Sequence, residues 1–193
     1  MLKRYCLLLF LFWSLGLWSQ EGRLSLELQF PATVDNNFIG SNYNGIIDVG
    51  AKYRFAQSGI FNFGAGLNLG LLTNPGNNDF GVDFTVNAIY VQPKGLIELR
   101  VTEISKLRPF LGVGLSVFTF SSPQSLSDFE LSDIPETQLG FNLSPGISYT
   151  IIGSVFVQLT YDFSLLSPDD DVPDTTFNTQ VSLLKIGVGY QFL

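Results

Sequence analysis

Apolar residues alternate with small or polar residues along most of the chain after residue 20, and this period of two is its most constraining feature. Between residues 61 and 71, Phe, Ala and Leu occupy every odd position, while Asn and Gly occupy every even one. Successive side chains of a β-strand point to opposite faces, so this pattern predicts strands with one apolar face. No segment shows the apolar spacing of a helix. We predict eight strands, within residues 24–30, 47–55, 61–71, 90–101, 111–117, 139–149, 155–164 and 184–192.

The connections between these segments alternate between long and short. The long ones are rich in Asn, Asp, Ser, Pro and Gly and cover residues 31–44, 73–83, 121–137 and 167–178. The short ones are turns at 56–59, 102–107 and 151–154. This alternation is typical of an up-and-down barrel with a loop end and a turn end. The sequence therefore predicts an all-β fold, an eight-stranded antiparallel up-and-down transmembrane β-barrel that forms one domain over residues 20–193.

The volume of the lumen decides which face of such a barrel points outward. An eight-stranded barrel encloses a lumen just wide enough for side chains to fill. Roughly five large apolar side chains per strand would overfill that lumen, whereas the Gly, Ser, Asn and Gln of the other face would fit. Each strand offers about 9–12 residues, enough to cross a bilayer when tilted. We therefore expect the apolar face to contact lipid; a soluble lipocalin-like, lipid-binding barrel is the alternative.

Residues 1–19 are predicted to be a cleaved signal peptide. Lys3 and Arg4 precede an apolar stretch at 7–18, which is shorter than the about 20 residues that a membrane-spanning helix needs. Ser19 supplies a small residue near the expected cleavage site. Cys6 is the only cysteine and lies before the apolar stretch rather than after it, which argues against lipidation.

Composition excludes several classes of function. The chain has no His, which removes the commonest general base and the commonest zinc ligand. Its single Cys permits neither an internal disulfide nor a cysteine metal site. We therefore expect neither enzymatic activity nor a cofactor. The formal net charge is −7, which argues against binding to nucleic acid, because such binding requires a basic surface.

Nine charged residues fall on the face predicted to line the lumen, five of them positive and four negative. Because unpaired charge in a narrow lumen is costly, we expect these residues to pair across strands and to plug the lumen. A pore selective for ions, which one sign of charge would normally line, is the alternative. In particular, Lys185 on the last strand is expected to contact Asp162 or Glu27 on the strands beside it. The predicted lumen network is Glu27, Asp48, Lys52, Arg54, Lys94, Glu98, Arg100, Asp162 and Lys185.

The four long connections carry 11 of the 17 acidic residues and no Lys or Arg. We interpret them as a solvated acidic rim. Clustered carboxylates can also bind divalent cations. The candidate ligands are Asp169, Asp170, Asp171 and Asp174, but their run lacks the spacing and the turn Gly of a calcium-binding loop, so no metal site is predicted.

Several features resemble the small outer-membrane β-barrel proteins of Gram-negative bacteria, the OmpA/OmpX-type, porin-like barrels. They are the export signal, the eight alternating strands, the segment Tyr-Val-Gln-Pro-Lys at 90–94 and the ending Gly-Val-Gly-Tyr-Gln-Phe at 187–192. The resemblance covers the whole mature chain. It implies residence in the lipid of the outer membrane, insertion by the barrel-assembly machinery, termini in the periplasm and long loops outside the cell. The expected role is structural or a surface interaction through the long loops, with a small-solute porin as the alternative.

Overall fold

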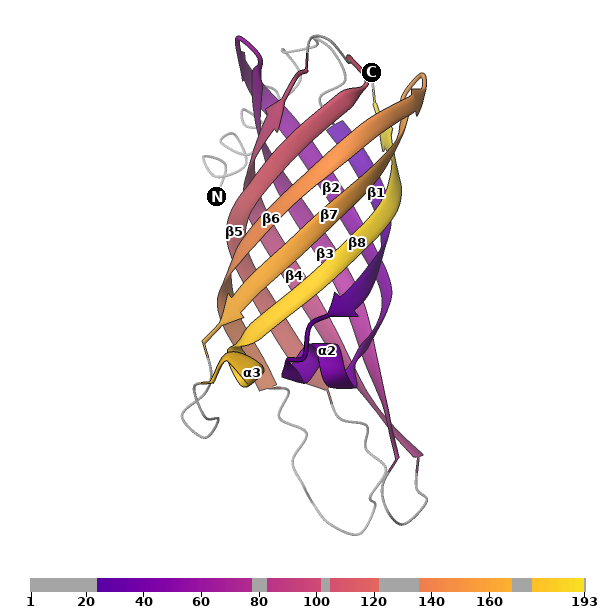
Figure 1. Cartoon of the computed structure of the whole chain (residues 1–193), viewed down its shortest axis with the longest axis vertical. Helices are drawn as coiled ribbons and strands as arrows, with labels where there is room; N and C mark the ends of the chain where they lie inside the picture. The colour runs from indigo at the N-terminus through magenta and orange to yellow at the C-terminus, as the bar shows by residue number, and fades with distance from the viewer. Residues whose placement is uncertain (1–23, 78–82, 102–104, 122–135, 168–174, 193) are drawn as a thin grey trace, which may run out of the picture.

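Eight antiparallel strands close into a single barrel (Figure 1). The computed structural model describes residues 24–77, 83–101, 105–121, 136–167 and 175–192. Each strand pairs with its neighbours in the sequence, and β8 pairs with β1 to close the barrel. The predicted fold is confirmed. The strands are β1 (Leu24–Val34), β2 (Asn44–Ser58), β3 (Phe61–Asn77), β4 (Asp83–Leu99), β5 (Leu107–Ser121), β6 (Glu136–Ile152), β7 (Val155–Leu166) and β8 (Gln180–Gln191).

The barrel has a turn end and a loop end (Figure 1). At the turn end, Gly59 and Gly153 have φ angles of 58° and 53°, which glycine adopts without steric cost in a tight hairpin turn. Leu24 and Phe192 also lie at this end, where the Phe192 N–H donates to the Leu24 carbonyl at 2.8 Å. At the loop end lie two short helices, α2 (Phe38–Asn42) and α3 (Thr176–Thr179). Among the described residues, no helix has the length and apolar character needed to cross a membrane.

Apolar side chains point outward and polar side chains point inward over most of the barrel wall. On β1, Leu26 and Leu28 are 45% and 51% exposed, whereas Glu27 between them is 3% exposed. On β8, Ile186 is 58% exposed and its neighbour Lys185 only 1%. An apolar belt of this extent would be unfavourable against water. The outward apolar face inferred from the volume of the lumen is confirmed.

Glycines on the inward face make room for large side chains of neighbouring strands. A Cβ atom added to Gly70 on β3 would lie 2.0 Å from Cζ of Tyr90 on β4. In the same way, a Cβ added to Gly146 on β6 would lie 2.4 Å from Cζ of Phe110 on β5. An aromatic ring that covers a glycine of the next strand fills the lumen without widening the barrel.

Gly70→Val is therefore expected to displace the Tyr90 ring and to break its 2.6 Å hydrogen bond to Asp48. Overpacking a filled interior typically costs about 1–3 kcal/mol, and the free energy of unfolding should fall by that amount. Urea titration of the barrel in lipid vesicles measures it. Gly95→Val is the control, because a Cβ at Gly95 points outward and meets only the Val113 carbonyl oxygen at 3.8 Å. An equal loss in both variants would contradict this explanation.

Every strand runs further toward the loop end than predicted, and β3 and β4 extend furthest. The hairpin of β3 and β4 is paired as far as Asn77 and Asp83, so much of the predicted long loop at 73–83 is strand. Its Asn, Pro and Gly residues have low strand propensity, which suggested a loop. Beyond the mouth of the barrel, however, a hairpin has free edges that tolerate Pro75. The predicted loop at 31–44 also differs, because β1 continues to Val34 and α2 lies within the loop.

Candidate functional site

The charged lumen is the candidate site. All but one of its nine predicted charged residues form ion pairs inside the barrel. The pairs fall into three groups that follow one another from the middle of the barrel to the turn end. Their order is that of the inward residues Asp48, Lys52 and Arg54 along β2, each of which belongs to one group.

The central cluster consists of Asp48, Lys94, Asp162 and Lys185. Nζ of Lys185 lies 2.8 Å from Asp48 on β2 and 2.7 Å from Asp162 on β7. Lys94 on β4 pairs with Asp162 at 3.3 Å. None of the four residues is more than 8% exposed, and their charges sum to zero. The predicted contact between Lys185 and Asp162 is therefore present. The second partner of Lys185 is Asp48 instead of Glu27.

Neutral polar side chains surround the central cluster. The Tyr90 hydroxyl donates to Asp48 at 2.6 Å. The Gln92 side-chain carbonyl accepts from Lys185 at 3.0 Å, and its amide nitrogen donates to Asp162 at 3.2 Å. Buried charges are stable only when they are both paired and hydrogen-bonded, and this arrangement meets both requirements. The amides of Asn68 and Asn142 donate further hydrogen bonds to the two carboxylates.

A second ion pair lies closer to the turn end. Lys52 on β2 pairs with Glu27 on β1 at 2.7 Å. Gln158 on β7 bridges the two, because its carbonyl accepts from Lys52 at 2.9 Å and its amide donates to Glu27 at 2.8 Å. Nζ of Lys52 also lies 3.8 Å from the centre of the Phe110 ring, within the range of a cation–π interaction. This group is neutral as well.

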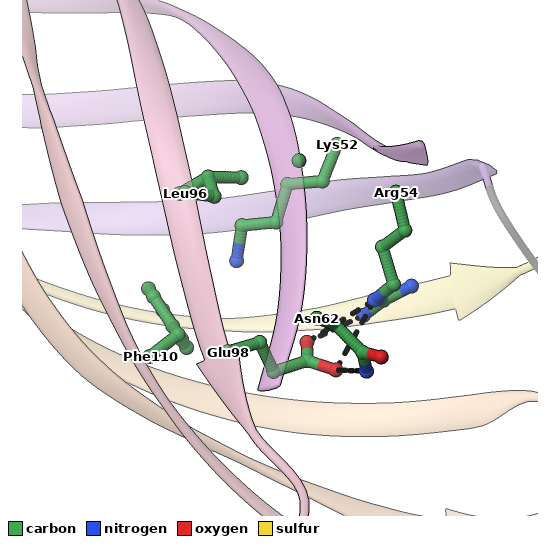
Figure 2. A pocket seen from close by; sticks show the side chains of 7 residues that line it. Lys52, Arg54, Asn62, Leu96, Glu98 and Phe110 are labelled. Carbon is green, nitrogen blue, oxygen red and sulfur yellow. Dashed lines mark hydrogen bonds and ion pairs between the residues drawn. The ribbon is translucent and has the colours of Figure 1, made fainter. Parts of the chain in front are cut away.

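The third group lies at the turn end, where two arginines contact the Glu98 carboxylate. Nη2 and Nε of Arg54 donate to the Glu98 carboxylate at 2.7 and 3.1 Å, a bidentate arrangement with well-defined geometry. Asn62 donates to the same carboxylate at 3.1 Å, and Figure 2 shows Arg54 and Asn62 converging on it. Arg108 on β5 lies 3.8 Å away. One carboxylate thus faces two guanidinium groups.

Arg100 does not belong to this network, and its prediction was wrong. Arg100 occupies an even-numbered position, like the inward residues of β4. However, β4 ends at Leu99, and Arg100 is exposed. A side chain beyond the end of the strand is no longer held over the lumen. Arg108 lies beside Glu98 instead. Arg108 lies two residues before the inward Phe110, and this spacing is the sequence signal for its inward position.

Two small cavities lie beside these groups. Their volumes are about 10 Å³ each, about the least that can hold one water molecule. The first lies among Arg54, Glu98 and Phe110 at the turn end (Figure 2). The second lies between Glu27 and the central cluster. Two buried oxygens that line the second cavity have no hydrogen-bond partner in the described part of the chain: Gln29 Oε1 and Thr160 Oγ1.

Toward the loop end the lumen changes from polar to apolar, a change that the alternation of the sequence does not predict. Phe118 on β5 packs on Tyr90 with 5.2 Å between ring centres. Tyr43, which follows α2, reaches across the mouth to Phe120 on β5, with 6.0 Å between ring centres. The apolar cap consists of residues that are at most 4% exposed: Ile39, Tyr43, Leu72, Ala88, Tyr90, Phe118, Leu166, Val181 and Leu183.

Local hydrogen bonds hold α2 in the mouth. The Asn37 side chain caps the helix by accepting from the Gly40 N–H at 2.7 Å. The Thr33 hydroxyl donates to the Tyr43 carbonyl at 2.7 Å and ties the end of the helix to β1. Burial raises the pKa of the Tyr43 phenol, and the nearby Glu136 carboxylate adds to this effect. The phenol is therefore neutral in the cap.

The candidate metal ligands Asp169, Asp170, Asp171 and Asp174 lie outside the described residues. Within the described ranges, no group of three or more His, Cys, Asp or Glu side chains is placed to hold a metal ion.

Comparisons with known proteins agree with this architecture. A family model described as the outer membrane protein β-barrel domain matches residues 7–192. The chain is similar in fold to the Neisserial surface protein A, with 20% identity, a TM-score of 0.56, and coverage of 88% of this chain and 96% of that one. It is also similar to Ail, the attachment invasion locus protein of Yersinia pestis, solved with the heparin analogue sucrose octasulfate, with 11% identity, a TM-score of 0.56, and coverage of 88% and 97%. A third similar structure is OprG from Pseudomonas aeruginosa, with 13% identity, a TM-score of 0.55, and coverage of 89% and 96%. No curated protein sequence matches the chain.

Proposed function

The chain belongs to the family of outer membrane proteins with a β-barrel domain, and from this premise we propose that it is a non-conducting barrel with a structural or surface-interaction role. It lies in the outer membrane, where its outward apolar side chains contact lipid. Inside, paired charges and the apolar cap plug the lumen. Partners are then recognised outside the barrel and do not pass through it.

The filling of the lumen is the observation that carries this proposal. A conducting pore requires a continuous wet path, and a selective one usually has a constriction lined by one sign of charge. Here Lys185 lies between carboxylates on β2 and β7, and the cavity beside it has a volume of about 10 Å³. The apolar cap adds a layer with little affinity for ions. These two layers favour the function of a non-conducting scaffold. A small-solute porin is the second candidate.

Planar-bilayer recording tests this proposal. We expect the purified, refolded barrel to produce no discrete openings, because a permeating ion would have to break the pairs of the central cluster and cross the apolar cap. Migration on a gel before and after boiling in detergent verifies that the sample is folded. Reproducible openings from a sample that migrates as a folded barrel would refute the plugged lumen and favour the porin.

We also infer the orientation and the route of the chain. The turn end, with Leu24 and Phe192, would lie in the periplasm, and the loop end would lie outside the cell. Residues 1–19 would be removed during export, and the barrel-assembly machinery would insert the domain at 20–193. Phe192 supports this route, because it is an aromatic residue that directly follows the last strand and is 42% exposed.

We propose, further, that the protein is not an enzyme. The chain has no His, so a nucleophile activated by His is unavailable to it. The buried carboxylates of Asp48 and Asp162 are held by lysines, and the adjacent cavity of about 10 Å³ is too small for an organic substrate. These groups are better explained as parts of the packed lumen.

A further inference from the structure

The charges at the turn end do not balance, unlike those of the other two groups in the lumen. Glu98 is 6% exposed and pairs with Arg54 at 2.7 Å, while Arg108 lies 3.8 Å from the same carboxylate. Arg100 is exposed just beyond β4, and Lys106 is exposed in the turn that follows. The described residues at this end therefore carry four positive charges and one negative charge.

Arg100 and Arg108 lie next to each other at this end. The strands β4 and β5 are paired as far as Glu98 and Phe110, and each arginine lies two residues beyond this pair, toward the turn end. The positive charges of Arg54 and Arg100 both act on the Arg108 guanidinium. Like charges this close repel one another, and a single carboxylate does not neutralise three guanidinium groups.

Two of these guanidinium groups also offer hydrogen-bond donors that the described residues do not use. Nη1 of Arg108 donates to Oε1 of Gln191 on β8 at 3.0 Å, but within the described part of the chain its Nε and Nη2 make no hydrogen bond. In the same part of the chain, the Arg100 side chain has neither a hydrogen bond nor an ion pair. Arg54, in contrast, is held by Glu98. The available donors therefore belong to Arg100 and Arg108.

We propose that the turn end binds a small anion that carries a phosphate group, held by the guanidinium groups of Arg100 and Arg108. A guanidinium presents paired N–H donors that match the oxygens of a phosphate, so two of them can share one phosphate. A phosphate ester carries about two negative charges at neutral pH and compensates the excess positive charge. That excess persists when Glu103, which the sequence adds to the same turn, is counted.

The phosphate approaches from the open side of the turn end and not through the lumen. The cavity beside Arg54 and Glu98 has a volume of only about 10 Å³, which is room for one water molecule. In the proposed orientation, the open side faces the periplasm and the periplasmic leaflet of the membrane. The same chemistry can therefore come from a soluble phosphate compound or from the headgroup of a lipid. The inference adds a binding site to the proposed scaffold and is independent of whether the lumen conducts.

Titration of pyrophosphate with the refolded barrel, followed by phosphorus NMR, tests the proposal. The barrel is first kept in a non-ionic detergent that contains no phosphate. We expect the pyrophosphate resonance to shift and broaden until the site is saturated. Arg100→Gln and Arg108→Gln should each weaken binding about tenfold, the usual effect of losing a hydrogen bond to a charged group. Arg108→Lys keeps the charge beside Glu98 but lacks the paired donors, so it should fold and still bind more weakly than the unchanged barrel.

Lys106→Gln is the matched control, because it removes an exposed positive charge from the same turn and should weaken binding little. An equal loss in Lys106→Gln and Arg108→Gln would overturn the proposed site by showing that only the net charge matters. Full affinity in Arg108→Lys would overturn the role of the paired donors. Each variant is compared only after its migration on a gel shows that it is folded.

A second titration, in nanodiscs of phospholipid, distinguishes the two sources of phosphate. Equal binding in detergent and in nanodiscs assigns the site to a soluble phosphate compound. Binding that is present in detergent and lost in nanodiscs assigns it to a lipid headgroup. Absence of binding in detergent, by a barrel that migrates as folded, would refute this inference and leave the plugged lumen intact, since conductance tests the lumen separately.

Discussion

Lys185→Met should strongly destabilise the barrel. Lys185 is 1% exposed and pairs with both Asp48 and Asp162. Met keeps most of the volume of the side chain but removes the charge, so the central cluster retains one lysine for two buried carboxylates. Removing one partner of a buried ion pair typically costs about 3–5 kcal/mol. We expect the free energy of unfolding, measured by urea titration in lipid vesicles, to fall by that amount, while export and barrel formation persist.

Two further variants separate charge from packing. Lys106→Met removes an exposed lysine in the β4–β5 turn and should change the free energy of unfolding little. Combining Lys185→Met with Asp48→Asn leaves a neutral pair, Lys94 with Asp162, and should recover much of the lost stability. A double variant no more stable than Lys185→Met alone would show that the loss is not caused by unbalanced charge.

The partners of Lys185 illustrate how far the sequence alone reaches. Its contact with Asp162 could be predicted, because consecutive strands pair and both residues have inward parity. Its contact with Asp48 could not, because it depends on the stagger of strands around the barrel. Gln29 on β1 pairs with Asp48, and Pro31, two residues on, pairs with Lys185. No local sequence signal specifies which residues of different strands lie at the same height along the barrel axis.

The apolar cap was not predicted for a different reason. Leu72 and Leu183 have the parity of inward residues, but each lies outside the stretch where alternation was clear. The helix α2 has only five residues, too few for helical periodicity to appear in the sequence. It is held by the Asn37 cap and by burial of Ile39 and Tyr43, which exists only once the strands have formed a mouth to fill. Alternation thus predicts the wall of the barrel and much of its lumen, but not what the loops bury at its end.

Phe118→Ala should leave a hole in the apolar cap beside Tyr90, the cap residue that contacts the central cluster. Phe118 is fully buried, and its ring centre lies 5.2 Å from that of Tyr90 and 6.3 Å from that of Phe120. Truncating a buried phenylalanine typically costs about 3–5 kcal/mol, from lost transfer free energy and from the cavity that remains. We expect a loss of that size in the free energy of unfolding. Tyr90 would also lose the ring that supports its hydrogen bond to Asp48.

Phe141→Ala distinguishes the two contributions, because the Phe141 ring lies on the outward wall and is 48% exposed. Both variants lose the free energy of transferring a phenyl ring out of water. Lipid chains can fill the space left by Phe141, whereas the strands around Phe118 cannot close over the space that it leaves. Phe118→Ala should therefore cost more than Phe141→Ala, and the difference measures how tightly the cap is packed. If the two losses were equal, the loop-end part of the lumen would be loosely filled, and the paired charges of the central cluster alone would have to keep ions out.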